Sequence, residues 1–94
     1  MNAKETLIQY GNELKARSNT SLKNESAEYI MGKAMVEGVC FRRDGNFRMS
    51  CRMYRNGNII TVTETKKYEV NEVVDKRLVM REIEQTNTVL TVEL

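Results

Sequence analysis

Hydrophobic residues recur at two different periods along the chain, and the period changes near Gly38. Before Gly38 they lie three and four residues apart, as on one face of an α-helix. A first helix before Ser18 has its apolar face at Ala3, Leu7, Ile8, Tyr10 and Leu14. A polar segment over 18–24 separates it from a second helix over 25–37, with a stripe at Ala27, Ile30, Met31, Ala34 and Met35. Gly38 is expected to end this helix in a left-handed conformation.

From Val39 onward apolar and polar residues alternate, which is typical of strands with one buried face. Asp44-Gly45 and Asn56-Gly57 are strong signals for tight turns between antiparallel strands. We therefore predict one α+β domain over residues 1–94, in which two N-terminal helices (1–38) pack on an antiparallel β-meander of four to six strands (39–94).

The two hairpins are predicted to have different loops. A two-residue turn at Asn56-Gly57 sets Met53 opposite Ile60, so that apolar side chains face each other. At the first hairpin a two-residue turn would mix the faces, whereas a three-residue loop over 43–45 sets Phe41 opposite Phe47. A bulged loop is therefore expected there. The helices should cover the face that carries Phe47, Met49, Met53, Ile60 and Val62.

The segment from Glu72 to Gln85 fits either a helix or two strands. Its composition allows a helix, but its apolar residues would spread around the whole helix circumference. The alternative is a strand ending near Val74, a turn at 75–76 and a strand from Leu78, followed by a further turn at 86–87. We favour the strands, and the helix stays open as the alternative.

Composition excludes several classes of protein. With 40% hydrophobic and 30% charged residues, the chain suits a folded domain better than a disordered tail. It has no stretch of eighteen apolar residues and no apolar segment near its start, so we expect neither a membrane span nor a secretory leader. Two cysteines fit free thiols in a reducing compartment. These observations predict an intracellular, cytoplasmic protein.

Groups for catalysis or metal binding are few. The chain has no histidine, the commonest general base, and its five glycines are scattered singly rather than gathered in a phosphate-binding loop. Cys40 and Cys51 are eleven positions apart with no imidazole to join them at a metal. The alternation sets them on opposite faces of the sheet, which is incompatible with a disulfide. We therefore expect no enzyme activity, no catalytic residue, no metal and no cofactor.

Positive charge is concentrated on the first hairpin. Residues 1–38 are neutral and residues 56–94 carry a net charge of −2, whereas residues 39–55 hold five arginines against Asp44 alone. Arginine presents a planar fork that binds phosphate or carboxylate and stacks on flat rings. The candidate binding residues are Arg42, Arg43, Arg48, Arg52, Tyr54 and Arg55.

By the predicted alternation, Arg42, Arg48, Arg52 and Tyr54 share the outward face of the sheet with Ser50. Arginines beside an aromatic ring are typical of surfaces that bind single-stranded RNA or an acidic protein. The leading hypothesis is a small non-enzymatic binding protein that presents this face to an acidic partner, RNA more than DNA or a nucleoprotein. An inhibitor or regulator of a nucleic-acid-handling machine fits this description. The alternatives are a purely protein-binding or self-assembling domain, which leaves a homo-oligomer open, a carrier of a small apolar ligand, and a solvated face without function.

Overall fold

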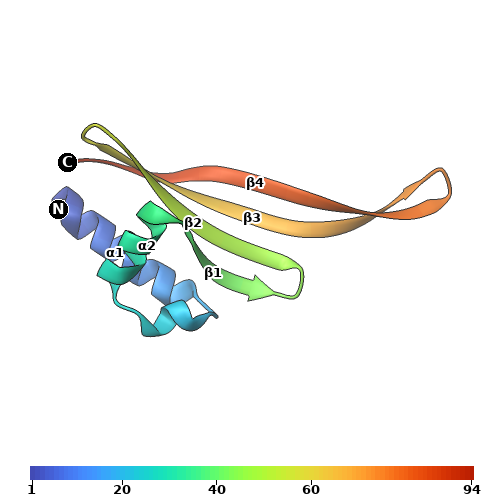
Figure 1. The fold of residues 1–94 in the computed structure, drawn as a ribbon, viewed down its shortest axis with the longest axis horizontal. Coiled ribbons are helices and arrows are strands. Elements are labelled where there is room, and N and C mark those ends of the chain that lie inside the picture. Colours follow the sequence, from blue (N-terminus) through green and yellow to red (C-terminus); the bar gives the residue numbers. More distant parts are fainter.

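The structure is a computed structural model that describes all of residues 1–94. In chain order the elements are α1 (Ala3–Arg17), η1 (Ser21–Asn24), α2 (Ala27–Val36), β1 (Val39–Asp44), β2 (Phe47–Asn56), β3 (Ile59–Val74) and β4 (Arg77–Glu93). The strands lie in the order β1-β2-β3-β4, all antiparallel, so the sheet is a simple meander (Figure 1). The predicted α+β fold is confirmed, with four strands in the sheet.

Local signals in the sequence begin and end the helices. Asn2 caps α1 by accepting a hydrogen bond from the Glu5 amide at 2.8 Å, and Ser26 caps α2 by accepting one from the Tyr29 amide at 3.1 Å. Gly38, with φ of 84°, follows the end of α2 in the left-handed conformation that was predicted for it. Each helix therefore has boundaries that its own sequence specifies.

The two helices approach closely at Gly11. A Cβ at this position would lie 3.0 Å from the Cβ of Ala27 and 3.1 Å from its carbonyl oxygen, closer than side chains normally pack. Glycine weakens a helix interior, so its presence in the middle of α1 is unfavourable for the isolated helix. Tertiary packing explains the residue, because only glycine leaves room for the start of α2.

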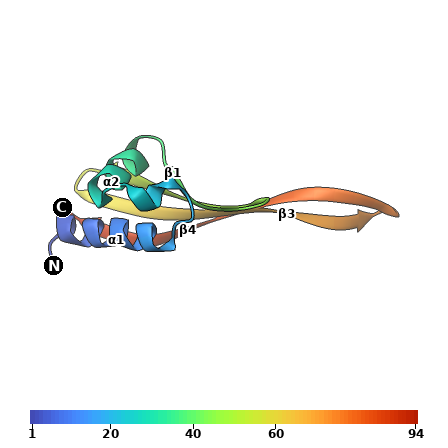
Figure 2. The same ribbon diagram turned by 90° about the horizontal axis from the view of Figure 1, so that it is seen from below.

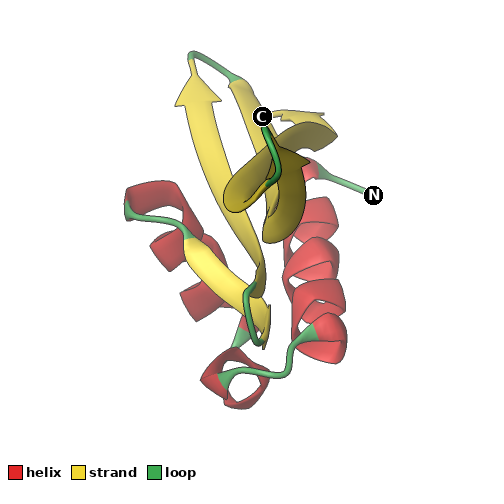
Figure 3. Ribbon diagram, turned by 90° about the vertical axis from the view of Figure 1, so that its right-hand side faces the viewer, coloured by secondary structure: helices red, strands yellow, loops and turns green.

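The hydrophobic core lies between the helices and one face of the sheet. Its buried members are Leu7, Tyr10, Leu14, Leu22, Ile30, Ala34, Val39, Phe41, Cys51, Met53, Ile60, Val62 and Val92. The prediction that the helices cover the face carrying Met53, Ile60 and Val62 is confirmed, while Phe47 and Met49 are half-buried at its margin. Seen from the far end of the sheet, the helices flank the lower part of the strands on both sides (Figure 3).

The second hairpin turns one residue later than predicted. Asn56 pairs with Ile59, so the turn residues are Gly57-Asn58 and not Asn56-Gly57. Gly57 has φ of 61° and takes the first central position, as glycine does in a type II′ turn. Met53 consequently pairs with Val62 and not with Ile60. The register error is two residues, and side chains alternate with a period of two, so every residue keeps its predicted face.

The first hairpin also differs from the prediction. Asp44 pairs with Phe47, so the expected three-residue loop is wrong and the connection is the two-residue turn Gly45-Asn46. β1 instead contains a β-bulge at Phe41, which has no partner on β2, and the register shifts there between Cys40 and Arg42. This bulge keeps the side chain of Phe41 fully buried in the core.

The ambiguous last third of the chain forms strands, which confirms the favoured prediction. β3 ends at Val74, the turn is Asp75-Lys76, and β4 begins at Arg77. The predicted further turn at 86–87 is wrong, because these residues continue β4 opposite 64–65 of β3. Neither glycine nor proline stands at 86–87, and threonine suits the interior of a strand.

The β3–β4 hairpin extends well beyond the rest of the sheet. Arg48, near the start of β2, pairs with Lys67, so further along β3 only β4 is beside it. We call residues 68–83 the arm. It projects away from the helices and from both chain termini (Figures 1 and 2), and it gives the molecule a length of 55 Å against 29 and 20 Å in the other directions.

Candidate nucleic-acid interface

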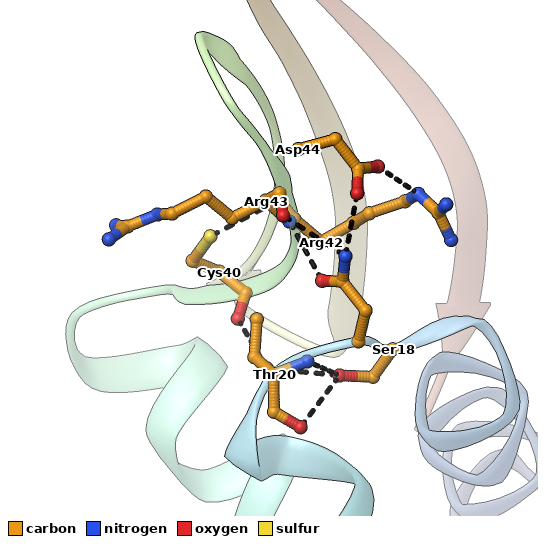
Figure 4. A network of polar contacts seen from close by, with 7 residues as sticks. Ser18, Thr20, Cys40, Arg42, Arg43 and Asp44 are labelled. Carbon is orange, nitrogen blue, oxygen red and sulfur yellow. Dashed lines mark hydrogen bonds and ion pairs between the residues drawn. The ribbon is translucent and has the colours of Figure 1, made fainter.

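The outward surface that was predicted to carry Arg42, Arg48, Arg52 and Tyr54 exists, but Arg43 belongs to it in place of Arg42. We call this surface, with Arg43, Arg48, Arg52 and Tyr54, the arginine face. The bulge at Phe41 inverts the alternation for the rest of β1, so that Arg43 pairs with Arg48. Arg42 turns to the helix side, where its Nε lies 2.8 Å from a carboxylate oxygen of Asp44. Figure 4 shows the two side chains pointing in opposite directions. Placing Arg42 on the outward face was wrong, because alternation counted along the sequence does not survive a bulge.

The loop between α1 and η1 holds the bulged end of β1 (Figure 4). The Asn19 side chain accepts a hydrogen bond from the Arg43 amide at 2.9 Å and donates to the Arg43 carbonyl at 3.0 Å. The Thr20 hydroxyl donates to the Cys40 carbonyl at 3.2 Å. These bonds satisfy backbone groups of β1, an edge strand of the sheet. They fix the backbone from which the Arg43 side chain projects.

Arg52 and Tyr54 lie on the outward face as predicted, and they contact each other. The guanidinium carbon of Arg52 is 5.4 Å from the centre of the Tyr54 ring, within the range of a cation–π contact. The aliphatic stem of Arg52 passes over Gly38, where an added Cβ would lie 3.9 Å from it. Tyr54 is 50% exposed, so its ring remains available to a ligand.

Arg55 does not belong to the outward face, although it was among the predicted binding residues. It pairs with Ile60, whose side chain is buried on the helix side of the sheet. The Arg55 guanidinium bends back to the turn and donates to the Gly57 carbonyl at 3.0 Å. Four of the six predicted residues therefore share one surface, and Arg42 and Arg55 lie on the opposite side.

Three cations form a row across the outward face. Arg43 pairs with Arg48, and Arg48 pairs with Lys67, which was not among the predicted residues. Neighbouring strands are about 4.8 Å apart, so this cationic row spans roughly 10 Å. Lys67 forms an ion pair with Glu82 at 3.1 Å, but no carboxylate lies within ion-pair distance of Arg43 or Arg48. Like charges directly opposite on adjacent strands are destabilising, and a bound anion would relieve that repulsion.

Hydroxyl groups line the sheet next to the cationic row. Ser50 pairs with Thr65, and Thr65 pairs with Thr86, with 2.9 Å between the two threonine hydroxyl oxygens. Together with the cationic row they line a shallow groove of about 500 Å³, which is also lined by Glu37 and by Glu84, the residue of β4 that pairs with Lys67. Guanidinium and hydroxyl groups are donors that proteins commonly use to bind phosphate oxygens.

A second polar cluster, which was not predicted, lies in the core. Glu64 is 9% exposed and accepts hydrogen bonds from the Tyr10 hydroxyl and from both terminal nitrogens of Arg17, the latter at 2.9 and 2.8 Å. The Arg17 guanidinium carbon also lies 4.9 Å from the centre of the Phe41 ring. No buried side-chain nitrogen or oxygen lacks a partner. The cluster therefore ties α1 to the middle of β3.

The environment of this cluster shifts the ionisation of its members. Burial opposes ionisation of Glu64, but hydrogen bonds from Arg17 and Tyr10 outweigh it and hold the pKa of the carboxyl below its ordinary value. Burial, and then the hydrogen bond to Glu64, raises the pKa of Tyr10. Burial raises the pKa of Cys51, opposite Glu64 on β2, to about 11. The Cys51 thiol is therefore protonated at neutral pH and is a poor nucleophile.

Comparison of the chain with protein-family models, curated proteins and solved structures gives no match. None of the helices is long and apolar enough to cross a membrane. No group of three or more histidine, cysteine, aspartate and glutamate residues is placed to hold a metal ion. The most distinctive feature of the surface is the arginine face, where Arg43 and Arg48 lie opposite each other.

Proposed function

We propose that this protein is a non-enzymatic binding module whose outward sheet face binds the phosphate backbone of a single-stranded nucleic acid, RNA more than DNA. The observation that supports this most is the cationic row, in which Arg43 and Arg48 lie directly opposite each other without an acidic partner. A phosphate is the anion that best suits a pair of guanidinium forks, because each fork donates two parallel hydrogen bonds.

The groups along β2 follow one another at a spacing that suits a nucleic-acid strand. Alternate residues of a strand lie about 6–7 Å apart, so Arg48, Ser50, Arg52 and Tyr54 offer in turn a cation, a hydroxyl, a cation and a ring. Phosphates bind at the cations, and a base stacks on the exposed side of Tyr54. The hydroxyls of Ser50 and Thr65 suit RNA, since they hydrogen-bond to the ribose 2′-hydroxyl that DNA lacks.

A binding module of this kind acts by covering the nucleic acid, because its binding face carries no catalytic group. We therefore place the protein among the inhibitors or regulators of nucleic-acid-handling machines, acting on the nucleic acid or on a nucleoprotein that presents the same phosphates. An acidic protein ridge is the main competing ligand. An acidic protein has no bases, so the Tyr54 ring contributes no stacking to its binding. The contribution of Tyr54 therefore distinguishes this ligand from a nucleic acid.

The proposal is tested by fluorescence anisotropy with labelled single-stranded RNA and DNA of the same sequence at several salt concentrations. With three phosphates neutralised, the slope of log affinity against log salt is about −2, so a fourfold rise in salt weakens binding roughly 20-fold. Arg48→Glu combined with Arg52→Glu should abolish binding. The corresponding lysine substitutions should lose only part of it, because the charge survives without the fork.

Arg55→Glu is the matched control, since it reverses one exposed charge of the same hairpin on the opposite side of the sheet. It should leave RNA affinity close to that of the wild type. Circular dichroism confirms that each variant is folded. RNA binding by the folded Arg48/Arg52 charge-reversal variant at wild-type strength, or an affinity that does not change with salt, would eliminate the arginine face as the interface.

A further inference from the structure

The tip of the arm, residues 73–80, carries apolar side chains that the chain itself leaves uncovered. Their exposed fractions lie between 42% and 76%, and none of them belongs to the buried core: Val73, Val74, Leu78, Val79 and Met80. A two-stranded hairpin is at best marginally stable on its own in water. The turn at 75–76 adds little, because both of its residues have positive φ, a conformation that costs free energy for residues other than glycine. Contact with a partner would therefore stabilise the tip.

A second uncovered apolar surface lies on α2, at Gly32. Tyr29 and Val36 are 50% and 77% exposed, and nothing lies within 4 Å of the position that a Cβ of Gly32 would occupy. The missing side chain leaves a shallow hollow of about 510 Å³, which we call the Gly32 hollow. It is lined by Glu28, Tyr29, Gly32, Lys33, Val36 and Glu37. Glycine weakens a helix interior. At Gly11 the packing of the chain requires glycine, but at Gly32 it does not.

The charges around the two surfaces are opposite in sign. The tip carries Lys76 and Arg77 with Asp75, a net charge of +1, whereas two glutamates and Lys33 give the Gly32 hollow a net charge of −1. Lys33 and Glu37 form an ion pair of 3.7 Å, and the other charged groups of the two surfaces form none within the chain. Each surface therefore offers the apolar contact and the charges that suit the other.

The two surfaces do not meet within one chain. α2 packs on β1 and β2, and the arm projects away from both helices (Figures 1 and 2). We infer that the tip of the arm binds the Gly32 hollow of a second copy of this chain. The Leu78 side chain, which is 74% exposed, enters the hollow between Tyr29 and Val36 of the other copy. The basic residues of the turn then lie beside the glutamates of the hollow.

The chain exposes enough surface for such a contact. Its accessible surface is 6385 Å², whereas a compact monomer of its mass has about 5,600 Å². The excess of roughly 800 Å² equals the area that each partner contributes to an interface of standard size. Each chain has one tip and one hollow. Two chains that exchange their arms reciprocally close as a dimer, and contacts made in one direction only continue into a longer assembly.

The assembly is tested by sedimentation of the full chain over a concentration series without nucleic acid. The wild type is expected to reach at least twice the 10.9 kDa of the chain. Gly32→Leu fills the hollow and should give a monomer that is no less stable than the wild type, because the space is free and leucine is the better helix former. Ala16→Leu is the matched control. It adds a leucine side chain at an exposed position of α1 and should leave the assembly intact.

Charge reversal tests whether the tip and the hollow contact each other. Lys76→Glu with Arg77→Glu, and separately Glu28→Lys with Glu37→Lys, should each raise the concentration needed for assembly by about tenfold or more. An equimolar mixture of the two double variants should assemble again. The reversed tip of one variant then meets the reversed hollow of the other, and the remaining tip and hollow are native.

A photo-cross-linking residue in place of Leu78 identifies the surface that the tip contacts. We expect cross-links to residues 28–37 of a second chain, and cross-links confined to other segments would overturn the inference. A wild type that stays monomeric throughout the series overturns it as well. So do assembly of Gly32→Leu at wild-type strength, loss of assembly in Ala16→Leu, and double variants that fail to recombine. Circular dichroism shows that each variant is folded.

The contact uses no residue of the arginine face, so the inference does not rest on the proposed function. Gly32→Leu leaves every arginine in place and should bind a short RNA strand with wild-type affinity. An assembling chain without RNA affinity refutes the proposed function and leaves the arm contact standing. A monomeric chain that binds RNA refutes the arm contact alone.

Discussion

Replacing Glu64 with glutamine tests how much the buried polar cluster stabilises the fold. Glutamine keeps the size and shape of the side chain but removes its charge, so the two hydrogen bonds from Arg17 at 2.9 and 2.8 Å become at most one, from the guanidinium to a neutral amide oxygen, and the attraction between opposite charges is lost. Hydrogen bonds to a charged group contribute about 1.5–3 kcal/mol, and neutral ones about 0.5–1.5 kcal/mol. The Arg17 side chain is 44% exposed, so solvent screens part of the difference. We expect the free energy of unfolding to fall by about 2 kcal/mol at neutral pH.

The cost of this substitution depends on pH. The carboxyl of Glu64 has a lower pKa in the folded chain than its ordinary value of 4.5, so its ionised form stabilises the fold above that pH. This contribution is lost as the pH falls through the folded pKa, whereas glutamine does not titrate. The difference in unfolding free energy between the two proteins should therefore be largest at neutral pH and narrow steadily in acid.

Urea unfolding followed by circular dichroism measures this difference at neutral pH and at about pH 3, with equal m-values required for the comparison. Glu72→Gln is the matched control, because it removes an ion pair of the same length, 2.8 Å to Arg81, from the exposed arm. Its effect should stay below about 1 kcal/mol. Equal losses for the two variants, or a Glu64→Gln loss as large in acid as at neutral pH, would refute this account of the cluster.

Two further predictions concern single positions. Gly11→Ala should lower the free energy of unfolding by more than about 1 kcal/mol despite the better helix propensity of alanine, because its Cβ meets the backbone of α2. Gly32→Ala should raise the free energy of unfolding by about 0.5–1 kcal/mol, because nothing lies within 4 Å of the added Cβ. Urea melts in which both variants gain stability would contradict the close contact of the helices at Gly11. Cys40 is partly exposed and should react with a thiol reagent in the native protein well before Cys51. Cys51 is buried, and burial raises its pKa to about 11. Equal reaction rates would contradict the burial of Cys51.

Residue-by-residue alternation was a reliable guide to the faces of the sheet, but not to its register. Met53 and Val62 were assigned to the buried face correctly even though the turn was placed one residue too early. Lys67 was missed for the same reason, because the predicted register put Thr65 opposite Arg48. Arg42 was misplaced for a different reason. The packing of Phe41 and the hydrogen bonds from Asn19, far away in the sequence, support a bulge that no pattern within β1 reveals.

Glu64 could have attracted attention from the sequence, because it occupies the next inward position after Ile60 and Val62. An acidic residue on a buried face implies a partner, since a buried charge is costly without one. The identity of that partner was beyond reach. Tyr10 and Arg17 lie 54 and 47 residues away along the chain, and only the docking of α1 on the sheet brings them together.

The sequence by itself indicated the two helices, the end of the second helix at Gly38, the hairpins that follow it and most of the side chains that face the core. These depend on interactions between near neighbours in the chain, with periods of 3.6 and 2. Only the tertiary structure decided the bulge that exchanges Arg42 for Arg43, the cationic row across three strands, and the arm that extends past β2. Each of these depends on how strands of unequal length pair and on what packs against them. The energies that choose among such pairings come from contacts between residues distant in the sequence, which local patterns do not contain.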